Sequence, residues 1–356
     1  MGFLTKRRLL TAALAAGGVA IFYGLNLPLP FLLGPLAACL IAALAGAQLQ
    51  EMGEAGKWMR TVLGVAVGAS VTPELFGRLP DMALSIALVP VFVLVIGAIG
   101  YPFFRRLLGY DAPTAYYAAM PGGLQDMLLF GQEAGGNVRT LSLIHATRVL
   151  VIVSLAPILI SGVWGVLLIN APGAPALDVP PEQLLIMLVV AVVGWRLAAA
   201  VRLFGAPILG PLILAAALSL TGILQYRPPA EAILAAQYFI GVGIGAAYTG
   251  ITMRELRKDV LAGVAFCLVL ALIALVFAEA VSLGGLAPPL EAFLAFAPGG
   301  QAEMVVLTLV AGADLAFVVT HHLVRLIVVI LGAPIFARLT DARKKGGRCL
   351  EDRGSG

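Results

Sequence analysis

Charged residues are scarce in this chain of 356 residues. They make up 12% of it, whereas a soluble domain carries about 25%. The apolar residues, at 61%, form long runs without the strict alternation that marks the strands of a membrane barrel. A membrane helix needs about 20 mostly apolar residues, and such runs follow one another almost from end to end. The sequence therefore predicts an all-α polytopic membrane protein, surrounded by the lipid bilayer.

Cysteine and histidine are also scarce, with three of each. The cysteines are far apart and show no CxxC spacing, so neither a disulfide framework nor a cysteine metal site is expected. The net charge of +4 comes from basic residues at the ends of apolar runs, which is the positive-inside pattern rather than a nucleic-acid-binding face. We expect no direct binding of nucleic acid, no catalytic residue, no metal and no cofactor.

One pattern occurs twice. Pro-Gly-Gly, two variable residues, an acid and Met are followed by His-x-x-Arg, first from Pro121 and again from Pro298, with a constant offset of 177 residues. An offset that is kept across polar and helix-breaking positions indicates an internal duplication. The predicted site for a substrate or ion consists of Gly122, Gly123, Asp126, His145 and Arg148 in the first copy and Gly299, Gly300, Glu303, His322 and Arg325 in the second.

The offset divides the chain into a membrane repeat at 1–168, a Pro-rich periplasmic linker at 169–183, a second repeat at 184–340 and a basic cytoplasmic tail at 341–356. We expect two tandem inverted repeats of about five spans each, plus a broken or re-entrant helix at each Pro-Gly-Gly stretch. The expected spans are 9–24, 31–49, 60–72, 82–103 and 139–164, then 184–201, 207–224, 235–250, 260–282 and 315–338; the broken helices are 114–136 and 292–313.

The inversion follows from the basic residues. If each broken helix enters and leaves on one side, a cytoplasmic N-terminus places all the Lys and Arg clusters inside except Arg78 and Arg227. An odd number of spans per repeat then inverts the second repeat, as in many secondary transporters. This predicts a multi-pass protein of the bacterial inner membrane with both termini in the cytoplasm.

Adjacent Pro and Gly residues predict that each helix stops inside the membrane, since Pro lacks the N–H and Gly favours non-helical turns. A new helix that starts after Gly123 or Gly300 would direct free N–H groups into the break, where they attract an anion. Asp126 and Glu303 follow three residues later. Two interpretations of these acids stay open: a cap on the helix terminus, or a carboxylate that binds a proton or cation during transport.

His145 and Arg148 share one helix face, and His322 and Arg325 repeat this spacing. A buried arginine costs roughly 2.5 to 3.5 kcal/mol on insertion scales, so it needs a partner, and the acid of the same half is the expected one. The set is either a structural ion pair or a substrate and proton site.

Two further expectations concern histidine and glycine. His321 has no polar counterpart in the first half and is predicted to be structural. Two acids and two imidazoles could converge on a metal, but the neighbouring arginines would repel a cation, which disfavours that hypothesis. Glycines four residues apart, at Gly64/Gly68 and again at Gly241/Gly245, predict close helix packing.

The duplicated Pro-Gly-Gly and His-x-x-Arg pattern resembles the Gram-negative AbrB duplication family over residues 9–338. The resemblance implies a duplicated, membrane-embedded fold and a role in the regulation of gene expression. Members carry names such as AbrB family transcriptional regulator or ammonia monooxygenase.

Our leading hypothesis is a secondary transporter of a small solute, with an anion favoured by the arginines and helix termini. The alternative is a membrane sensor that regulates genes through a partner. An oxygenase ranks third because it needs a metal, and three histidines without a ligand cluster give little support. The sequence leaves open whether the protein forms a homo-oligomer.

Overall fold

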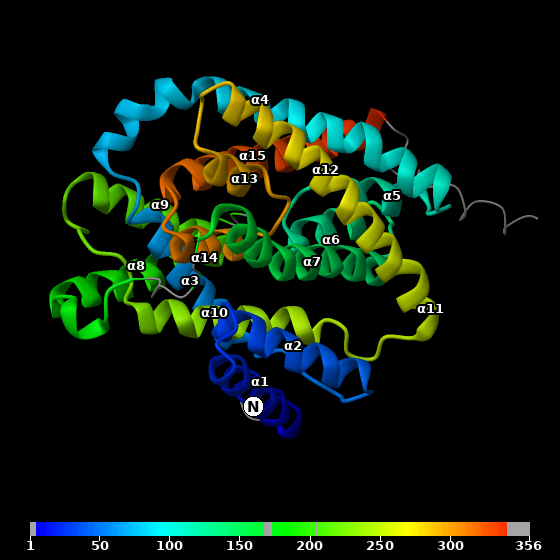
Figure 1. Cartoon of the computed structure of the whole chain (residues 1–356), viewed down its shortest axis with the longest axis horizontal. Helices are drawn as coiled ribbons and strands as arrows, with labels where there is room; N and C mark the ends of the chain where they lie inside the picture. Colours follow the sequence, from blue (N-terminus) through cyan, green and yellow to red (C-terminus); the bar gives the residue numbers. More distant parts are fainter. Residues whose placement is uncertain (1–4, 167, 169–172, 202, 204, 340–356) are drawn as a thin grey trace, which may run out of the picture.

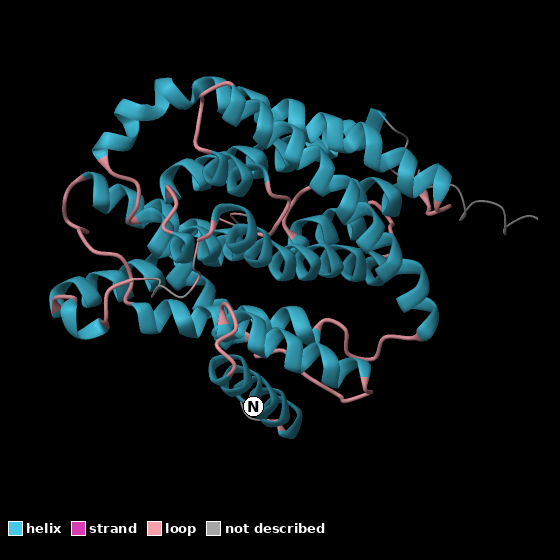
Figure 2. Ribbon diagram, viewed as in Figure 1, coloured by secondary structure: helices cyan, strands magenta, loops and turns pink. Residues whose placement is uncertain are grey.

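The computed structural model describes residues 5–166, 168, 173–201, 203 and 205–339, with their side chains except those of 74–76, 124–126, 129, 301–302 and 333–339. These residues form helices and no strand (Figure 2). Five helices in this part of the chain are long and apolar enough to cross a membrane. The prediction of an all-α polytopic membrane protein is confirmed. The predicted tail at 341–356 and residues 169–172 of the predicted linker lie outside the described residues.

The two halves have a similar order of helices (Figure 1), except that the π-helical turn follows the long helix in the first half and precedes it in the second. The first half contains α1 (Lys6–Gly24), α2 (Pro30–Leu44), α3 (Glu54–Gly68), α4 (Pro73–Pro102), the π-helical turn η1 (Phe103–Leu107), α5 (Ala112–Ala119), α6 (Leu124–Glu133) and α7 (Val138–Trp164). After the 3-10 turn η2 (Ala176–Asp178) come α8 (Pro181–Ala200), α9 (Ala206–Leu220), α10 (Ala230–Ala246), α11 (Met253–Glu255), the π-helical turn η3 (Leu256–Val260), α12 (Leu261–Leu283), α13 (Pro289–Phe296), α14 (Gln301–Ala311) and α15 (Leu315–Leu339).

Several helices begin earlier than the apolar runs suggest. α3 begins at Glu54 rather than at residue 60, and α4 begins at Pro73, where proline fits the first helical turn, rather than at residue 82. α8 begins at Pro181, inside the predicted linker. As a result Arg60 lies within the second turn of α3, not at the end of a span.

Four of the expected spans are short helices. α2, α3, α9 and α10 have 15 to 17 residues, fewer than the about 20 that cross a bilayer core. They pair between the halves, α3 with α9 and α10 with α2. A Cβ atom on Gly64 would collide with the backbone carbonyl of Ile208, and one on Gly241 with that of Leu32. The predicted close packing at these glycines is confirmed, and in each case the partner helix belongs to the other half.

α4 and α12 lie side by side and run in opposite directions across the top of Figure 1. Near the start of α4, Arg78 lines a pocket together with Leu286, which follows the end of α12. At the other end, the ring of Phe104, just after α4, contacts Phe266 near the start of α12, with centroids 4.7 Å apart. The corresponding long helices of the two halves are therefore antiparallel.

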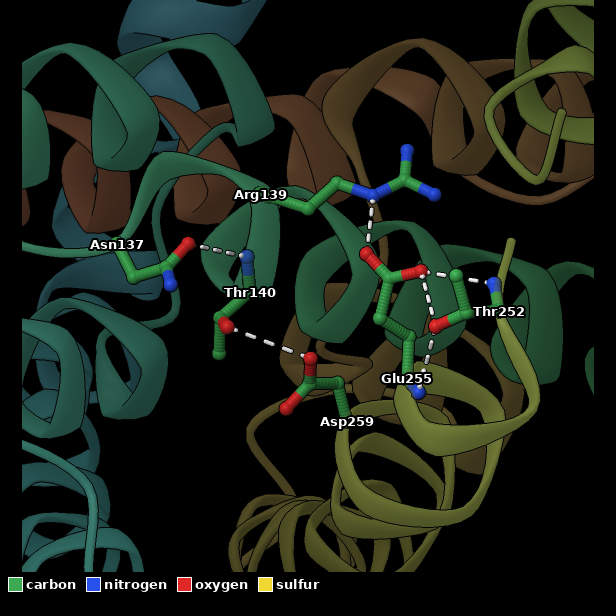
Figure 3. Close-up of polar contacts among 6 residues, drawn as sticks. All are labelled: Asn137, Arg139, Thr140, Thr252, Glu255 and Asp259. Carbon is green, nitrogen blue, oxygen red and sulfur yellow. Dashed lines mark hydrogen bonds and ion pairs between the residues drawn. The ribbon is translucent and has the colours of Figure 1, made fainter. Parts of the chain in front are cut away.

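Two ion pairs show that α7 and α15 also begin at opposite ends of the molecule. Arg139, in the first turn of α7, lies 2.8 Å from Glu255 at the start of the α11–α12 segment (Figure 3). Asp314, which caps α15 by accepting the Phe317 N–H, lies 2.7 Å from Arg78 near the start of α4. Because α6 and α14 lead into α7 and α15 through short turns, these two helices also point to opposite ends.

Asp314 lies near both basic residues that the positive-inside rule places on the outer side of the membrane, Arg78 and Arg227. Arg78 pairs with Asp314, and the charge of Asp314 also acts on Arg227. One acid thus partly compensates both cations.

α7 occupies the interior. Of its most apolar 18-residue stretch, 67% of the residues are buried inside the protein, against 33% to 44% for the other four long helices. Polar groups on α7 therefore have to find their partners inside the protein.

Candidate functional site

The Pro-Gly-Gly motifs interrupt two helices at equivalent places. α5 ends at Ala119 and α6 begins at Leu124, while α13 ends at Phe296 and α14 begins at Gln301. Each interruption, which we call a helix break, leaves the last carbonyls of one short helix and the first N–H groups of the next without helical partners.

The glycines of the breaks provide space rather than unusual dihedral angles. Gly123 has φ −64° and Gly300 has φ −73°, values that any residue adopts. A Cβ on Gly122 would meet the Met127 side chain, and one on Gly299 would meet Met304 in the same way. The predicted helix breaks are confirmed. The glycines add room there for side chains that fold back over the break.

The buried histidine and arginine of α7 bind carbonyl groups of the first break. His145 Nε2 donates to the Tyr117 carbonyl at 3.0 Å, and Arg148 donates to the Met120 and Gly122 carbonyls at 3.2 and 2.7 Å. Donors at the carboxyl end of a helix satisfy its free carbonyls and oppose its dipole. We call this arrangement the Arg-His clamp.

The second break has the same clamp 177 residues later. His322 Nε2 donates to the Leu294 carbonyl at 2.9 Å, and Arg325 donates to the Ala297 and Gly299 carbonyls at 2.8 and 3.0 Å. All four clamp residues are buried, with at most 6% of each exposed. Every acceptor in the first break has its counterpart in the second.

The expected pairing of arginine with the acid of its own half is wrong for Arg325. Its hydrogen bonds go to two carbonyls and to His322 Nδ1, and within the described residues no ion pair joins it to Glu303. The helix break itself supplies the acceptors, which is why a carboxylate is not needed. The side chain of Asp126, the expected partner of Arg148, lies outside the described residues.

The neighbours of His322 define its tautomer. Arg325 Nη2 approaches His322 Nδ1 at 3.3 Å, and because arginine can only donate, Nδ1 must accept and Nε2 must carry the proton. In the first half, His145 Nδ1 has no hydrogen-bond partner among the described residues. The two histidines thus differ at Nδ1, which contacts the clamp arginine in the second half and has no hydrogen-bond partner among the described residues in the first.

Glu303 lies in the first turn of α14. Its carboxylate occupies the space that a Cβ on Gly300 would need. The cations that act on it are Arg60 and Arg148, which both belong to the first half. α14 contacts α3 and α7 of the first half, so Glu303 lies at the junction between the halves. Both interpretations of this acid, cap or ion-binding carboxylate, stay predictions.

Arg60 and Gln237 were not among the site residues predicted from the sequence. They occupy equivalent positions 177 residues apart, on α3 and α10, one turn before Gly64 and Gly241. Gln237 is 1% exposed, and its Nε2 has no partner among the described residues. The repeat offset could have revealed them, because it aligns two polar residues within apolar surroundings.

His321 behaves as a structural residue. Its Nδ1 bonds to the Phe317 carbonyl at 2.8 Å and its Nε2 to Ser85 Oγ at 3.0 Å. The bond to Ser85 joins α15 to α4. For the other two histidines, Nε2 is occupied by a carbonyl, so neither offers that nitrogen to a metal ion.

The fold and the site define a class: a helical membrane protein with two clamped helix breaks that meet at the junction of its halves. Residues 31–341 match the family model described as "Transition state regulatory protein AbrB", and the chain belongs to this AbrB family.

Two relatives extend along nearly the whole chain. A Bacillus subtilis (strain 168) protein named "Uncharacterized protein YhjN" is 26% identical over 352 residues, covering 92% of this chain and 91% of its own length. An Escherichia coli (strain K12) protein named "Putative regulator AbrB" is 24% identical over 326 residues, covering 89% of this chain and 91% of its own.

Proposed function

We propose that this protein is a secondary transporter of a small anionic solute in the bacterial inner membrane. The observation that carries the proposal is the pair of identical Arg-His clamps on helix breaks whose following helices point to opposite ends of the molecule. Inverted repeats with broken helices are the architecture of many secondary transporters. In this proposal residues 1–168 and 184–340 are the inverted repeats, and both termini are cytoplasmic.

The clamps explain which end of each break is available to a solute. Because His145, Arg148, His322 and Arg325 engage the carbonyl ends, the N–H ends of α6 and α14 are the ends left to attract a ligand. Arg148 and Arg325 are close enough to influence each other electrostatically. Two arginines and two helix N-termini at one junction favour an anion.

Glu303 supplies the coupling in this proposal. Its carboxylate lies over Gly300 at the start of α14, where an anion would bind. Protonation of Glu303 would remove that negative charge and release the terminus, so that a proton and an anion bind together. Asp126 is proposed to act likewise in the first half.

The test is uptake by proteoliposomes under an imposed proton gradient. We expect proton-driven flux of at least one member of a panel of phosphate, sulfate, acetate, succinate and chloride. Glu303→Gln and Asp126→Asn should abolish the dependence on the gradient. The matched control is Glu182→Gln, an exposed acid in the first turn of α8, which should leave flux unchanged. Absence of flux for every anion would refute an anion transporter.

A sensor that regulates genes is the second candidate, since one relative is named a regulator. Its output would need a cytoplasmic surface, such as the tail at 341–356. Deletion of that tail should leave uptake intact if the protein is a transporter. Loss of a transcriptional response with intact ligand binding would favour the sensor. We further propose that the protein is not an enzyme. Purified protein without a stoichiometric metal would rule out the oxygenase, which needs one.

A further inference from the structure

A basic groove opens where the end of α4 meets the start of α12, and no residue of the Arg-His clamps lines it. Its volume is about 780 Å³. Its lining includes three exposed cations, Arg254, Arg257 and Lys258, and apolar residues such as Leu108, Leu261 and Ala265. The groove is therefore amphipathic, and its cations come just before the apolar lining residues of α12 along the chain.

The nearest acids do not neutralise these cations. Glu255 is occupied by Arg139 at 2.8 Å and by Thr252 (Figure 3). Within the part of the chain that the structure describes, no ion pair involves Arg254, Arg257 or Lys258. The groove carries three positive charges without an acidic counterpart.

The second nearby acid is buried and directed inward. Asp259 accepts from the Tyr110 hydroxyl at 2.8 Å and from Thr140 Oγ1 at 3.3 Å. Burial and the bond to Asp259 raise the pKa of the Tyr110 phenol, which keeps it a donor. Asp259 thus holds Tyr110, which lines the groove, and forms no ion pair with the three cations among the described residues.

Two π-helical turns bring further cations to the same place. η3 carries Arg257 and Lys258, and η1 carries Arg105 and Arg106. Tyr110 joins the two turns: Arg105 donates to its carbonyl at 2.8 Å, and Lys258 Nζ lies 4.6 Å from its ring centroid. π-helical turns are rare and frequently lie at functional sites.

The apolar side of the groove continues along α12. Leu261, Leu268 and Leu272 follow one another at helical spacing and are 60%, 55% and 65% exposed. These side chains face away from the protein, along the depth of the bilayer. A ligand that uses both parts of the groove needs an anionic head and a long apolar tail.

We propose that this groove binds an anionic phospholipid, with the phosphate at Arg254, Arg257 and Lys258 and an acyl chain along Ala265 and Leu268. Basic pockets between membrane helices are a known setting for acidic headgroups. A soluble phosphate would use the cations and leave the apolar side empty. The site is separate from the helix breaks and does not depend on transport.

The test is a titration of the purified full-length protein with lipid, followed by native mass spectrometry. Palmitoyl-oleoyl phosphatidylglycerol should bind more tightly than the phosphatidylcholine with the same chains. Arg257→Gln/Lys258→Gln should weaken the binding of phosphatidylglycerol roughly 30-fold, since each of the two cations near a membrane surface contributes about 1 kcal/mol. Ala265→Phe fills the exposed apolar side without changing charge and should weaken the same lipid several-fold.

The matched control is Lys6→Gln/Arg7→Gln, which removes two exposed cations from the start of α1. It should change the affinity for phosphatidylglycerol by less than about twofold. Equal losses in both double variants, or equal affinity for the two lipids, would show a general charge effect and overturn the proposal. Glycerol phosphate that competes as well as the intact lipid would also overturn it, because the apolar side would then contribute nothing.

Discussion

The two halves of the molecule make the same hydrogen bonds to the carbonyl groups of their helix breaks. They differ in the charged residues that lie where the halves meet. Both clamps bind the same three carbonyl positions, 26 and 28 residues before each arginine and 28 before each histidine. Arg60 of the first half, in contrast, corresponds to Gln237 of the second. The halves share the requirements of a broken helix, and the chemistry of the junction is free to diverge.

The peripheral ion pairs show the same divergence. Arg78 and Glu255 occupy equivalent positions with opposite charges, and each pairs with a residue at the start of α15 or α7. Both ion pairs connect the start of a long helical segment in one half, α4 or α11–α12, with the start of the last helix of the other half, α15 or α7. The sign of the charge at each end has reversed.

The largest expected effect tests the equivalence of the clamps. Arg148→Gln and Arg325→Gln each remove the donors of two break carbonyls. A buried polar group left without its partner costs about 1 to 3 kcal/mol, so each free energy of unfolding should fall by roughly 2 to 6 kcal/mol. Equilibrium unfolding in mixed micelles measures this, with the exposed Arg7→Gln as control. A large loss in only one half would break the equivalence.

The next effect concerns the helix pairs between halves. Gly64→Ala and Gly241→Ala each place a Cβ against a backbone carbonyl that cannot move aside. Overpacking of this kind costs about 1 to 3 kcal/mol, and the two losses should be similar. Gly243→Ala on α10 has no atom within 4 Å and should be neutral or stabilising, by up to about 1 kcal/mol. A similar loss at Gly243 would show that helix flexibility, not close approach, is responsible.

A smaller effect separates the two histidines. His322→Phe removes the bonds to the Leu294 carbonyl and to Arg325, whereas His145→Phe removes the bond to the Tyr117 carbonyl. The loss of stability should be larger for His322 by about 1 kcal/mol, the contribution of one hydrogen bond. The same unfolding experiment reports it. An equal loss would mean that the Arg325–His322 contact contributes nothing.

The smallest effect belongs to the ion pairs. Double-mutant cycles on Arg139/Glu255 and Arg78/Asp314 should give coupling energies of about 0.2 to 1 kcal/mol, because all four side chains are partly exposed. Both couplings should fall in 1 M salt, whose screening length is about 3 Å. If one of the two coupling energies stayed the same in 1 M salt, that ion pair would be buried and the two ends of the molecule would differ.

Much of this fold is legible in the sequence because membrane helices need long apolar runs and Pro-Gly-Gly interrupts them. The interruptions after Ala119 and Phe296 fall within the predicted stretches. The starts of α3 and α4 were missed because Glu54 to Arg60 and Pro73 to Asp81 carry charges within regular helix. Apolar content marks the lipid-facing part of a helix, not its ends.

The partner of Arg325 could not be read from the sequence for a different reason. Every residue carries a backbone carbonyl, and only the folded break reveals which of them lack a donor. A search limited to side chains selects the acid, which is the wrong group for Arg325. The basic groove was missed because a π-helical turn shifts the helical phase without leaving a sequence pattern.

The clamps also bear on how the chain is made. Arg148 binds carbonyls at Met120 and Gly122, which leave the ribosome before it does, and the hydrogen bonds of Arg325 are equally local. The segments α5–α7 and α13–α15 each contain both the arginine and the carbonyl groups that it binds. The free-energy cost of placing that arginine in the membrane is therefore offset within one segment, so the first half can insert before the second is synthesised.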